Sequence, residues 1–258
     1  MSGLVVLKIG GSVITDKSKP FTYREETVKR IGTEVFRCWP TSLIIIHGGG
    51  SFGHPIAKQY EISKGYKELR QLEGFVKTMQ AMRELNSLVV KSLVDAGIGA
   101  VGMPASLLFV TRNGVIETAL LDTLFAALDL GVIPVTCGDV VFDREKKFTV
   151  LSGDNIAVYL ARRLRAKRLV FAIDVDGVYE ISRETGDKKL LEELDRRKHS
   201  TLLYQEADDV TGGLFNKVDE AFNAVNDGIE VLIVNGLVEG RVEAAVKGKP
   251  VKGTKLVK

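Results

Sequence analysis

The sequence predicts an α/β fold in which a mainly parallel sheet carries helices on its faces. Short apolar runs with strand character alternate with amphipathic segments along the whole chain. Glycines or acidic residues follow several of these runs, as they do where parallel strands end in ligand-binding loops. With 258 residues and 45% apolar content, the chain is long enough to bury a large core.

Residues 1–165 contain most of the predicted elements. Apolar runs of about five residues are typical of buried strands, and apolar residues at 3.6-residue spacing are typical of helices. Gly97 ends the longest helix, since glycine commonly follows a helix C-terminus. Tight turns at 112–114 and 143–146 indicate two hairpins. Strands are expected at 4–9, 43–47, 98–103, 107–111, 132–136, 140–142 and 147–150, and helices at 24–36, 69–96, 120–130 and 154–164.

The remaining residues, 166–258, continue the same alternation. A buried-type strand at 168–173 is followed by the segment 174–179 and then by a hydrophilic loop that is expected to extend to about residue 200. Further elements are a helix at 214–226, a strand at 231–234, a helix at 238–247 and a last strand at 253–257 that closes the sheet edge. We expect two lobes, an N-terminal one at 1–165 and a C-terminal one at 166–258.

Composition excludes several classes of protein. A formal net charge of +3 is too slight for a broad nucleic-acid footprint. The two cysteines, Cys38 and Cys137, lack metal-ligand spacing and favour a reduced, intracellular protein. Because the first apolar run ends in Lys8, no signal peptide is predicted, and no apolar run approaches the roughly 20 residues that span a membrane. We therefore expect a cytoplasmic protein with neither nucleic-acid nor membrane partners.

The most informative segment is the glycine loop after the second strand. Gly48-Gly49-Gly50 and Gly53 lie within six residues, directly before His54. Glycines in that number let backbone N–H groups point at one anion, above all a phosphate. A second glycine turn, Lys8-Ile-Gly-Gly-Ser12, ends the first strand. Two such loops, one with a lysine and one with a histidine, indicate phosphoryl transfer.

Two well-known phosphate motifs do not fit this loop. Gly48-x-Gly50-x-x-Gly53 has the spacing of the dinucleotide fingerprint, but residues 66–73 are polar and helical where a strand ending in an acidic residue is required. The P-loop needs Lys-Ser/Thr where this chain has His54-Pro55. Pro55 fits the first position of a helix, so the loop and the helix start are expected to face one ligand.

Five motifs, taken in order, resemble the amino acid kinase family over essentially the whole chain. They are Lys8-x-Gly-Gly-Ser12, His47-Gly-Gly-Gly50, Ser152-Gly-Asp154, Asp174-Val-Asp-Gly-Val178, and Gly212-Gly213 with Lys217. Within the family, Gly50-Ser-Phe-Gly-His54 and Thr15-Asp-Lys17 resemble the isopentenyl phosphate kinase branch. The fosfomycin kinases are similar to that branch in sharing the histidine.

This resemblance implies an open αβα sandwich with a mainly parallel central sheet, which is the amino acid kinase fold. It implies ATP-dependent phosphorylation of isopentenyl phosphate to isopentenyl diphosphate, a step of isoprenoid biosynthesis in the alternative mevalonate pathway. ATP and Mg²⁺ are the implied cofactors, with Mg²⁺ held mainly by ATP phosphates and by no metal site of the protein. A homodimer is implied as well.

The resemblance assigns catalytic roles to five residues. Lys8, Lys17 and Lys217 offset the charge on the transferred phosphoryl group. Asp154 orders Lys8 and Lys217 by ion pairing. His54 donates a hydrogen bond to the phosphate that the acceptor already carries. No general base is required, because a phosphate monoester dianion is already a nucleophile.

The resemblance also gives each substrate its contacts. ATP is expected to contact Lys8, Gly10, Gly11, Ser12, Gly50, Asp174, Gly212 and Lys217, and the acceptor phosphate is expected to contact Gly49, Gly50, Gly53, His54 and Gly153. For the acceptor tail, the helical spacing of Phe75, Val76, Met79 and Met82 is suited to an apolar pocket, with Phe75 and Met79 as the expected contacts. Such a stripe is also typical of plain core packing.

Three other functions remain open from the sequence. A kinase of the same fold that acts on fosfomycin or another phosphonate differs only in its acceptor. A non-catalytic nucleotide sensor is disfavoured because Lys8, Asp154 and Lys217 occur together. A nicotinamide oxidoreductase is disfavoured by the failure of the dinucleotide fingerprint.

Overall fold

One central sheet organises the chain. The computed structural model describes residues 3–182, 185–205 and 212–258. Within them, eight strands form a sheet in the order β12-β14-β13-β9-β1-β2-β6-β3. All neighbours from β13 to β3 are parallel, whereas β14 is antiparallel to β13. The sheet strands are β1 (Val5–Ile9), β2 (Leu43–His47), β3 (Ala100–Gly102), β6 (Ile133–Cys137), β9 (Arg168–Ile173), β12 (Glu193–Leu194), β13 (Glu230–Asn235) and β14 (Gly253–Leu256).

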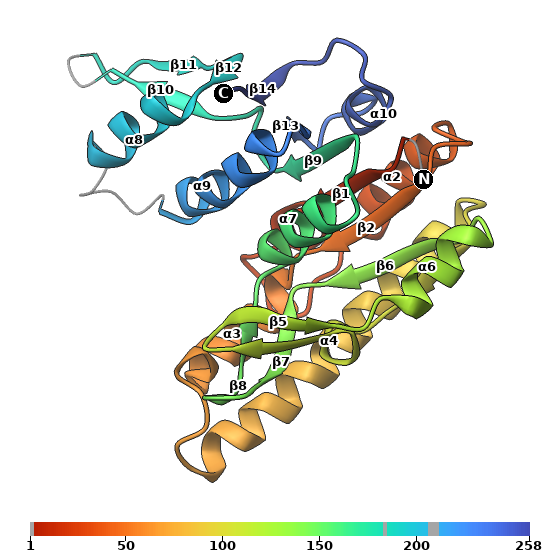
Figure 1. Ribbon diagram of the computed structural model, residues 1–258, viewed down its shortest axis with the longest axis vertical. Coiled ribbons are helices and arrows are strands. Elements are labelled where there is room, and N and C mark those ends of the chain that lie inside the picture. Colours follow the sequence, from red (N-terminus) through yellow and green to blue (C-terminus); the bar gives the residue numbers. More distant parts are fainter. Residues whose placement is uncertain (1–2, 183–184, 206–211) are drawn as a thin grey trace.

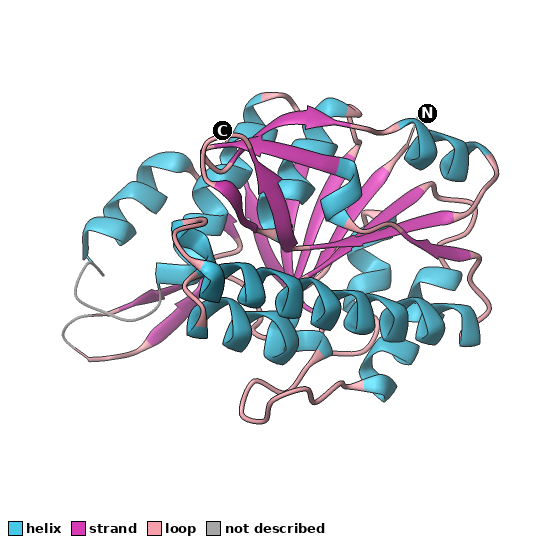
Figure 2. Cartoon of the chain, turned by 90° about the horizontal axis from the view of Figure 1, so that it is seen from below, coloured by secondary structure: helices cyan, strands magenta, loops and turns pink. Residues whose placement is uncertain are grey.

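Helices cover both faces of this sheet, as Figures 1 and 2 show. The core on one face is completed by α2 (Glu25–Phe36), α4 (Leu69–Asp95) and α10 (Arg241–Lys247), and the core on the other by α7 (Gly153–Arg163) and α9 (Gly212–Asn226). Successive residues of β1 point to opposite faces, so Leu7 packs toward α2 and α4 while Val6 packs toward α7 and α9. The predicted mainly parallel αβα sandwich is confirmed.

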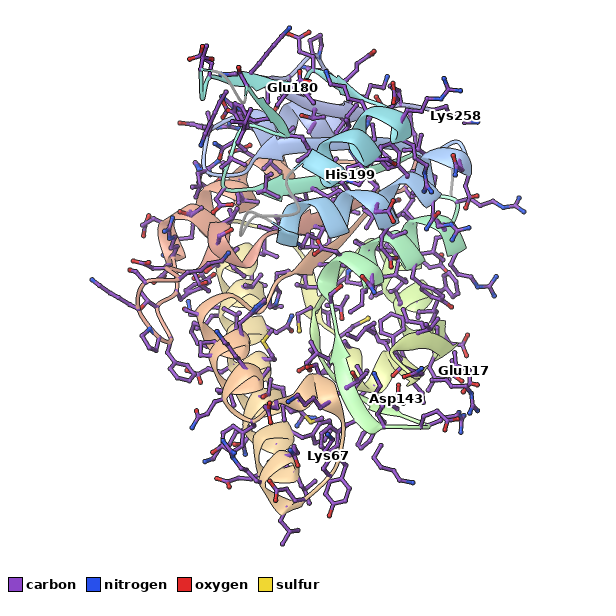
Figure 3. The ribbon with its side chains drawn as sticks, turned by 90° about the vertical axis from the view of Figure 1, so that its left-hand side faces the viewer. Lys67, Glu117, Asp143, Glu180, His199 and Lys258 are labelled. Carbon is purple, nitrogen blue, oxygen red and sulfur yellow. The ribbon has the colours of Figure 1, made fainter. Side chains whose placement is uncertain are left out.

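A second sheet, in the order β5-β4-β7-β8, lies at the end of the molecule near α4 (Figure 1). Both predicted hairpins are present in it, and one carboxylate holds both turns. Asp143, which Figure 3 labels, accepts hydrogen bonds from the Thr111 hydroxyl at 2.7 Å and from the Gly114 and Lys146 amides at 2.8 Å. The strands are β4 (Phe109–Arg112), β5 (Val115–Ala119), β7 (Asp139–Asp143) and β8 (Lys147–Leu151).

The hydrophilic segment after residue 178 is not the loop that we predicted. It contains β10 (Tyr179–Ile181) and β11 (Lys188–Leu190), which pair as an antiparallel hairpin, then β12 and the start of α8 (Arg196–Gln205). The hairpin joins no other strand among the described residues, so most of its side chains meet solvent and carry no apolar alternation. Because β12 pairs with β14 on its outer side, the last strand lies one position inside the sheet edge.

The helix after the glycine loop also starts earlier than predicted. Helix α3 (Gly50–Gln59) begins five residues before Pro55, which therefore lies inside it. Proline has no N–H for the carbonyl four residues before it, here that of Ser51. That carbonyl instead accepts a hydrogen bond from the Phe21 amide at 3.2 Å. A neighbouring loop thus satisfies the group that proline leaves without its helical donor.

The short elements complete the fold. They are α1 (Gly11–Ile14), α5 (Ala105–Leu108), α6 (Asp122–Asp129) and the 3₁₀ turn η1 (Ile62–Lys64). None of the described helices is both long enough and apolar enough to cross a membrane.

Candidate active site

A cavity of about 830 Å³ opens at the carboxyl ends of the parallel strands. The loops after β1, β2, β6 and β9 form its walls, together with the first turn of α7. Such an edge is where open α/β sheets bind ligands. The predicted site residues that line the cavity are Lys8, Gly10, Gly11, Ser12, Lys17, Gly49, Gly50, Gly53, His54, Gly153, Asp154 and Asp174.

Glycine backbones from separate loops touch at the floor of this cavity. A Cβ atom on Gly11 would lie 2.4 Å from the Gly50 nitrogen, and one on Gly48 would lie 2.6 Å from the Gly11 nitrogen. Gly138 and Gly153 meet in the same way, with a Cβ on Gly138 only 2.5 Å from the Gly153 nitrogen. Only glycine allows backbones this close, so the loops are fixed against one another.

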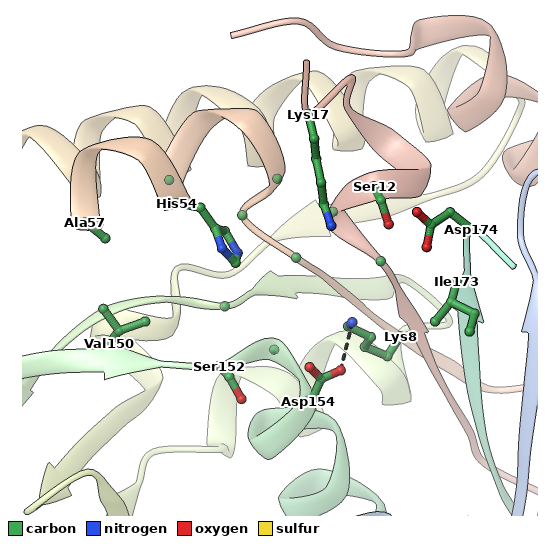
Figure 4. Close-up of a pocket in the computed structure, with 18 of the residues that line it drawn as sticks. Lys8, Ser12, Lys17, His54, Ala57, Val150, Ser152, Asp154, Ile173 and Asp174 are labelled. Atoms are coloured by element: carbon green, nitrogen blue, oxygen red, sulfur yellow. Dashed lines mark ion pairs between the residues drawn. The ribbon is translucent and has the colours of Figure 1, made fainter. Parts of the chain in front are cut away.

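Lys8 reaches the cavity from β1 because strand side chains alternate. Leu7 and Ile9 enter the core under α2 and α4, so Lys8 points to the face that carries α7. There its Nζ lies 2.7 Å from Oδ1 of Asp154, and Lys8 is only 3% exposed (Figure 4). A buried cation held this way is positioned before any phosphate arrives.

Asp154 is not the N-cap of α7. The cap is Ser152, whose hydroxyl oxygen accepts a hydrogen bond from the Asn155 amide at 3.1 Å. Asp154 lies in the first helical turn, where a negative charge is favoured by the helix dipole. The capping and ion-pairing functions are therefore divided between Ser152 and Asp154.

His47 supports the glycine loop from behind. Its Nδ1 lies 3.0 Å from the Gly48 carbonyl oxygen, so this nitrogen carries the proton, and its Nε2 accepts a hydrogen bond from the Asn86 amide at 3.0 Å. The imidazole is completely buried. Burial, together with the charge of Lys8, lowers the pKa of His47 to about 4. The ring is therefore neutral at physiological pH and fixes where β2 passes into the loop.

We expect this buried histidine to make the protein acid-sensitive. A histidine whose pKa falls from 6.5 to about 4 on folding stabilises the native state above pH 6.5, and that stability is lost as the pH falls toward 4. The shift corresponds to about 3 kcal/mol of unfolding free energy. Urea unfolding of the wild type across this pH range measures it.

Two histidine variants serve as controls for that measurement. His47→Gln should lose most of the acid-dependent change, whereas exposed His54→Gln should retain it. An equal acid response in both variants and the wild type would contradict a role for His47.

The cavity has two chemically different ends. In Figure 4, Ser12 and Asp174 lie toward one end, and Ala57 and Val150 lie toward the other. Lys8, Lys17 and His54 lie between them, with Lys17 and His54 directed into the cavity from the opposite side to Lys8. This arrangement suits a polyphosphate at one end, a phosphate at the centre and an apolar group at the other end.

The two apolar contacts predicted from α4 do not line the cavity. The Phe75 ring stacks on Phe148 with centroids 4.7 Å apart, and Met79 packs against the same cluster, because this face of α4 meets the β7–β8 hairpin. They lie in the layer of side chains behind the wall. The residues that line the apolar end are Ala57, Thr78, Met82, Val140 and Val150.

The second glycine-rich segment is described only in part. The predicted helix begins after Gly212 and Gly213. In the structure these two glycines instead form the first turn of α9. Lys217 lies in the same helix, and its side chain lies outside the described part of the structure. Asp176 points away from the cavity, where hydrogen bonds from Lys252, Asn235 and Arg241 hold its pKa well below the usual range.

One wall of the cavity consists of residues that were not predicted from the sequence. Gly138 and Asp139 follow β6 and line the cavity, as Gly10 follows β1 and Gly48 follows β2. A glycine two residues after the strand predicted at 132–136 was the available signal. Tyr179 and Lys188 of the β10–β11 hairpin also line the cavity, and no sequence pattern indicated them.

Comparison with known proteins identifies the family of this chain. The sequence profile of the amino acid kinase family matches residues 3–235. This chain belongs to the amino acid kinase family. The resemblance to this family, predicted from five motifs, is therefore confirmed.

Within the amino acid kinase family, several isopentenyl phosphate kinases are similar over nearly the full chain. The enzyme of Methanothermobacter thermautotrophicus is 36% identical over 263 residues, covering 98% of each chain. That of Thermoplasma acidophilum is 31% identical over 90% of this chain and 92% of its own. A solved isopentenyl phosphate kinase superimposes with a TM-score of 0.85 and 34% identity, covering 98% of this chain and 99% of that structure.

Proposed function

We propose that the chain transfers the γ-phosphoryl group of ATP to isopentenyl phosphate and forms isopentenyl diphosphate. One observation carries the proposal: His54 and the paired Lys8 line a single cavity whose far end is apolar. A phosphate monoester with a short hydrocarbon tail matches that order of groups. The similarity to isopentenyl phosphate kinases supports the same acceptor.

In the proposed reaction, an oxygen of the acceptor phosphate attacks the γ-phosphorus of ATP. A new P–O bond forms, the bond from that phosphorus to the β–γ bridging oxygen breaks, and ADP leaves with the electron pair. Lys8, Lys17 and Lys217 offset the negative charge, Asp154 positions Lys8, and His54 holds the acceptor phosphate in line. The dianionic acceptor loses no proton, so no general base takes part.

We further propose that ATP occupies the end of the cavity near Ser12 and Asp174, with Gly212 and Lys217 supplied by α9. That division assigns acceptor binding mainly to residues 1–165 and nucleotide binding mainly to 166–258. Mg²⁺ would be held mainly by the ATP phosphates, where it neutralises part of their charge. A cytoplasmic homodimer acting in the alternative mevalonate pathway completes the proposal.

A panel of acceptors tests the proposed reaction. ADP release with Mg-ATP is measured for isopentenyl phosphate, dimethylallyl phosphate, fosfomycin, acetylglutamate and uridylate. We expect turnover of isopentenyl phosphate to be far above that of the other acceptor classes. Turnover of fosfomycin alone would show that the acceptor is a phosphonate and not isopentenyl phosphate. No turnover of any of the five acceptors, with ATP still bound, would support a nucleotide sensor.

His54→Ala is expected to raise the KM for isopentenyl phosphate about 10- to 100-fold, since a hydrogen bond to a charged phosphate contributes about 1.5 to 3 kcal/mol. The KM for ATP should remain nearly unchanged, because His54 lies on the acceptor side in this proposal. Steady-state kinetics with each substrate varied in turn measures both. Gln59→Ala, an exposed change on the same helix, is the control. An equal loss of ATP affinity would contradict the assignment.

A further inference from the structure

One acidic residue of the motif at 174–178 has no part in the reaction proposed above. We call these five residues the nucleotide loop. Asp174, Val175, Gly177 and Val178 line the cavity at the end assigned to ATP, where Figure 4 labels Asp174. Asp176, at the centre of the loop, does not line it, and its carboxyl group meets the C-terminal part of the chain instead. Asp176 can therefore act on a nucleotide only through the loop that carries it.

Three elements from the C-terminal part of the chain meet at the Asp176 carboxylate. Its Oδ1 accepts hydrogen bonds from the Arg241 guanidinium at 2.6 Å and from the Asn235 side-chain amide at 3.1 Å. Its Oδ2 lies 2.8 Å from Nζ of Lys252. Asn235 ends β13, Arg241 opens α10 and Lys252 directly precedes β14. Because hydrogen bonds between charged groups are short and strong, this carboxylate fixes the middle of the nucleotide loop to all three elements.

The far end of the nucleotide loop is fixed separately, by Thr254 of β14. The Thr254 hydroxyl is completely buried, accepts a hydrogen bond from the Val178 amide at 2.8 Å and donates one to the Leu191 carbonyl at 2.6 Å. The loop also lies close against this side chain, since a Cβ atom on Gly177 would be 2.4 Å from Thr254 Oγ1. The C-terminal strand therefore supports the nucleotide loop from behind.

We infer that Asp176 is a positioning residue for the nucleotide, which holds the middle of the nucleotide loop in the place where its neighbours line the ATP end of the cavity. The inference rests on the proposed function, because that function places ATP at this end. Without the carboxylate, Thr254 would still hold the end of the loop, but nothing would join its middle to Arg241 and Lys252. The subsite would then have to be ordered when ATP binds, which lowers affinity.

Charge and position predict opposite effects of removing this carboxylate. Asp176→Asn leaves the charges of Arg241 and Lys252 unneutralised close to the ATP end. Through charge alone, the variant should attract the anionic nucleotide more strongly than the wild type does. Loss of the loop's position should instead weaken binding. Weaker binding by the variant therefore reports position and cannot come from the change in charge.

Calorimetric binding of Mg-ATP, without any acceptor, tests the inference. We expect the Kd of Asp176→Asn to be about 10-fold above that of the wild type, as for residues that act on a ligand through a contact network. In turnover assays the KM for ATP should rise by a similar factor, whereas the KM for isopentenyl phosphate and kcat at saturating ATP should stay within about twofold.

Glu243→Gln is the matched control for Asp176→Asn. Glu243 is a similarly buried carboxylate of α10 that pairs with Lys247 at 2.6 Å and with Arg37 at 3.6 Å, and none of these three residues lines the cavity. The control removes the same charge from a comparable pair without touching the nucleotide loop. Its Kd for Mg-ATP should remain within about twofold of the wild type.

Unchanged or tighter Mg-ATP binding by folded Asp176→Asn would overturn the inference, as would equal weakening in Glu243→Gln. If Asp176→Asn does not fold, Lys252→Met replaces it, because this largely exposed lysine is only one of the three partners. We then expect a Kd about threefold higher, and an unchanged Kd would overturn the inference. A wild type that binds Mg-ATP but does not turn over isopentenyl phosphate would instead contradict the proposed acceptor and leave this comparison intact.

Discussion

Lys8→Met is expected to lower kcat by roughly 10³-fold, because it removes a preorganised cation from the point where charge develops. Methionine preserves the length and apolar stem of the side chain, so the core contacts of β1 should persist. The Lys8–Asp154 pair is 2.7 Å long, and both side chains are at least nine-tenths buried. Loss of charge in such a place is not compensated by water. Single-turnover kinetics with saturating ATP and isopentenyl phosphate measures the effect.

The same variant should be destabilised by about 3 kcal/mol, because it leaves the Asp154 carboxylate buried without this cation. Adding Asp154→Asn should recover most of the unfolding free energy but none of the activity. Lys91→Met is the matched control, since it breaks a 2.6 Å pair with Asp95 that is largely exposed and should cost less than about 0.5 kcal/mol. If the double variant regained turnover, Lys8 would be a structural residue and not a catalytic one.

Local patterns predicted the central sheet well. The strands β1, β2 and β9 each have a single polar residue in an otherwise apolar run, and each is buried along its whole length between two helical layers. Turn residues at 112–114 and 143–146 marked both hairpins of the second sheet. These elements were predictable because one local signal, burial or turn chemistry, dominates each of them.

Other features depend on contacts between distant residues. The early start of α3 requires the Phe21 amide at the Ser51 carbonyl, 30 residues earlier in the chain, which no local pattern around Pro55 reveals. The β10–β11 hairpin is held by strand pairing and by polar contacts such as the Lys198–Glu180 ion pair, so its composition resembles that of a loop. In both cases the local sequence favours a different structure from the one that tertiary contacts select.

The site residues were likewise predictable only where a local sequence pattern determines them. Motif order indicated the residues of the glycine loops, because backbone chemistry restricts those positions to glycine. Of the four stripe residues predicted on α4, Phe75, Met79 and Met82 pack inward, whereas Val76 is 46% exposed. Helical spacing also could not tell that Met82 alone of the four lines the cavity, since that depends on where the β7–β8 hairpin packs. Asp139 was missed because a single carboxylate after a glycine is ordinary in sequence and becomes unusual only when buried in a cavity wall.

Gly11→Ala is the second change with a large expected effect. Its Cβ would lie 2.4 Å from the nitrogen and 2.7 Å from the Cα of Gly50, so backbone would have to move. Overpacking of this kind costs about 1 to 3 kcal/mol, and separating the two loops by even a fraction of an ångström misaligns both phosphate subsites. We expect a fall in kcat/KM of about 100-fold for both substrates, measured beside the urea midpoint.

Gly99→Ala is the matched control for this prediction, because the nearest atom to its Cβ would be Val132 Cγ2 at 4.0 Å. That variant should keep wild-type stability and kinetics within about 0.5 kcal/mol. The contrast separates contact between loops from the general cost of replacing glycine. A Gly11→Ala protein that was stable and fully active would mean that the Gly11 and Gly50 backbones need not touch. The contact between the two glycines would then have no role in catalysis, and alignment of the two phosphates would have to come from side chains alone.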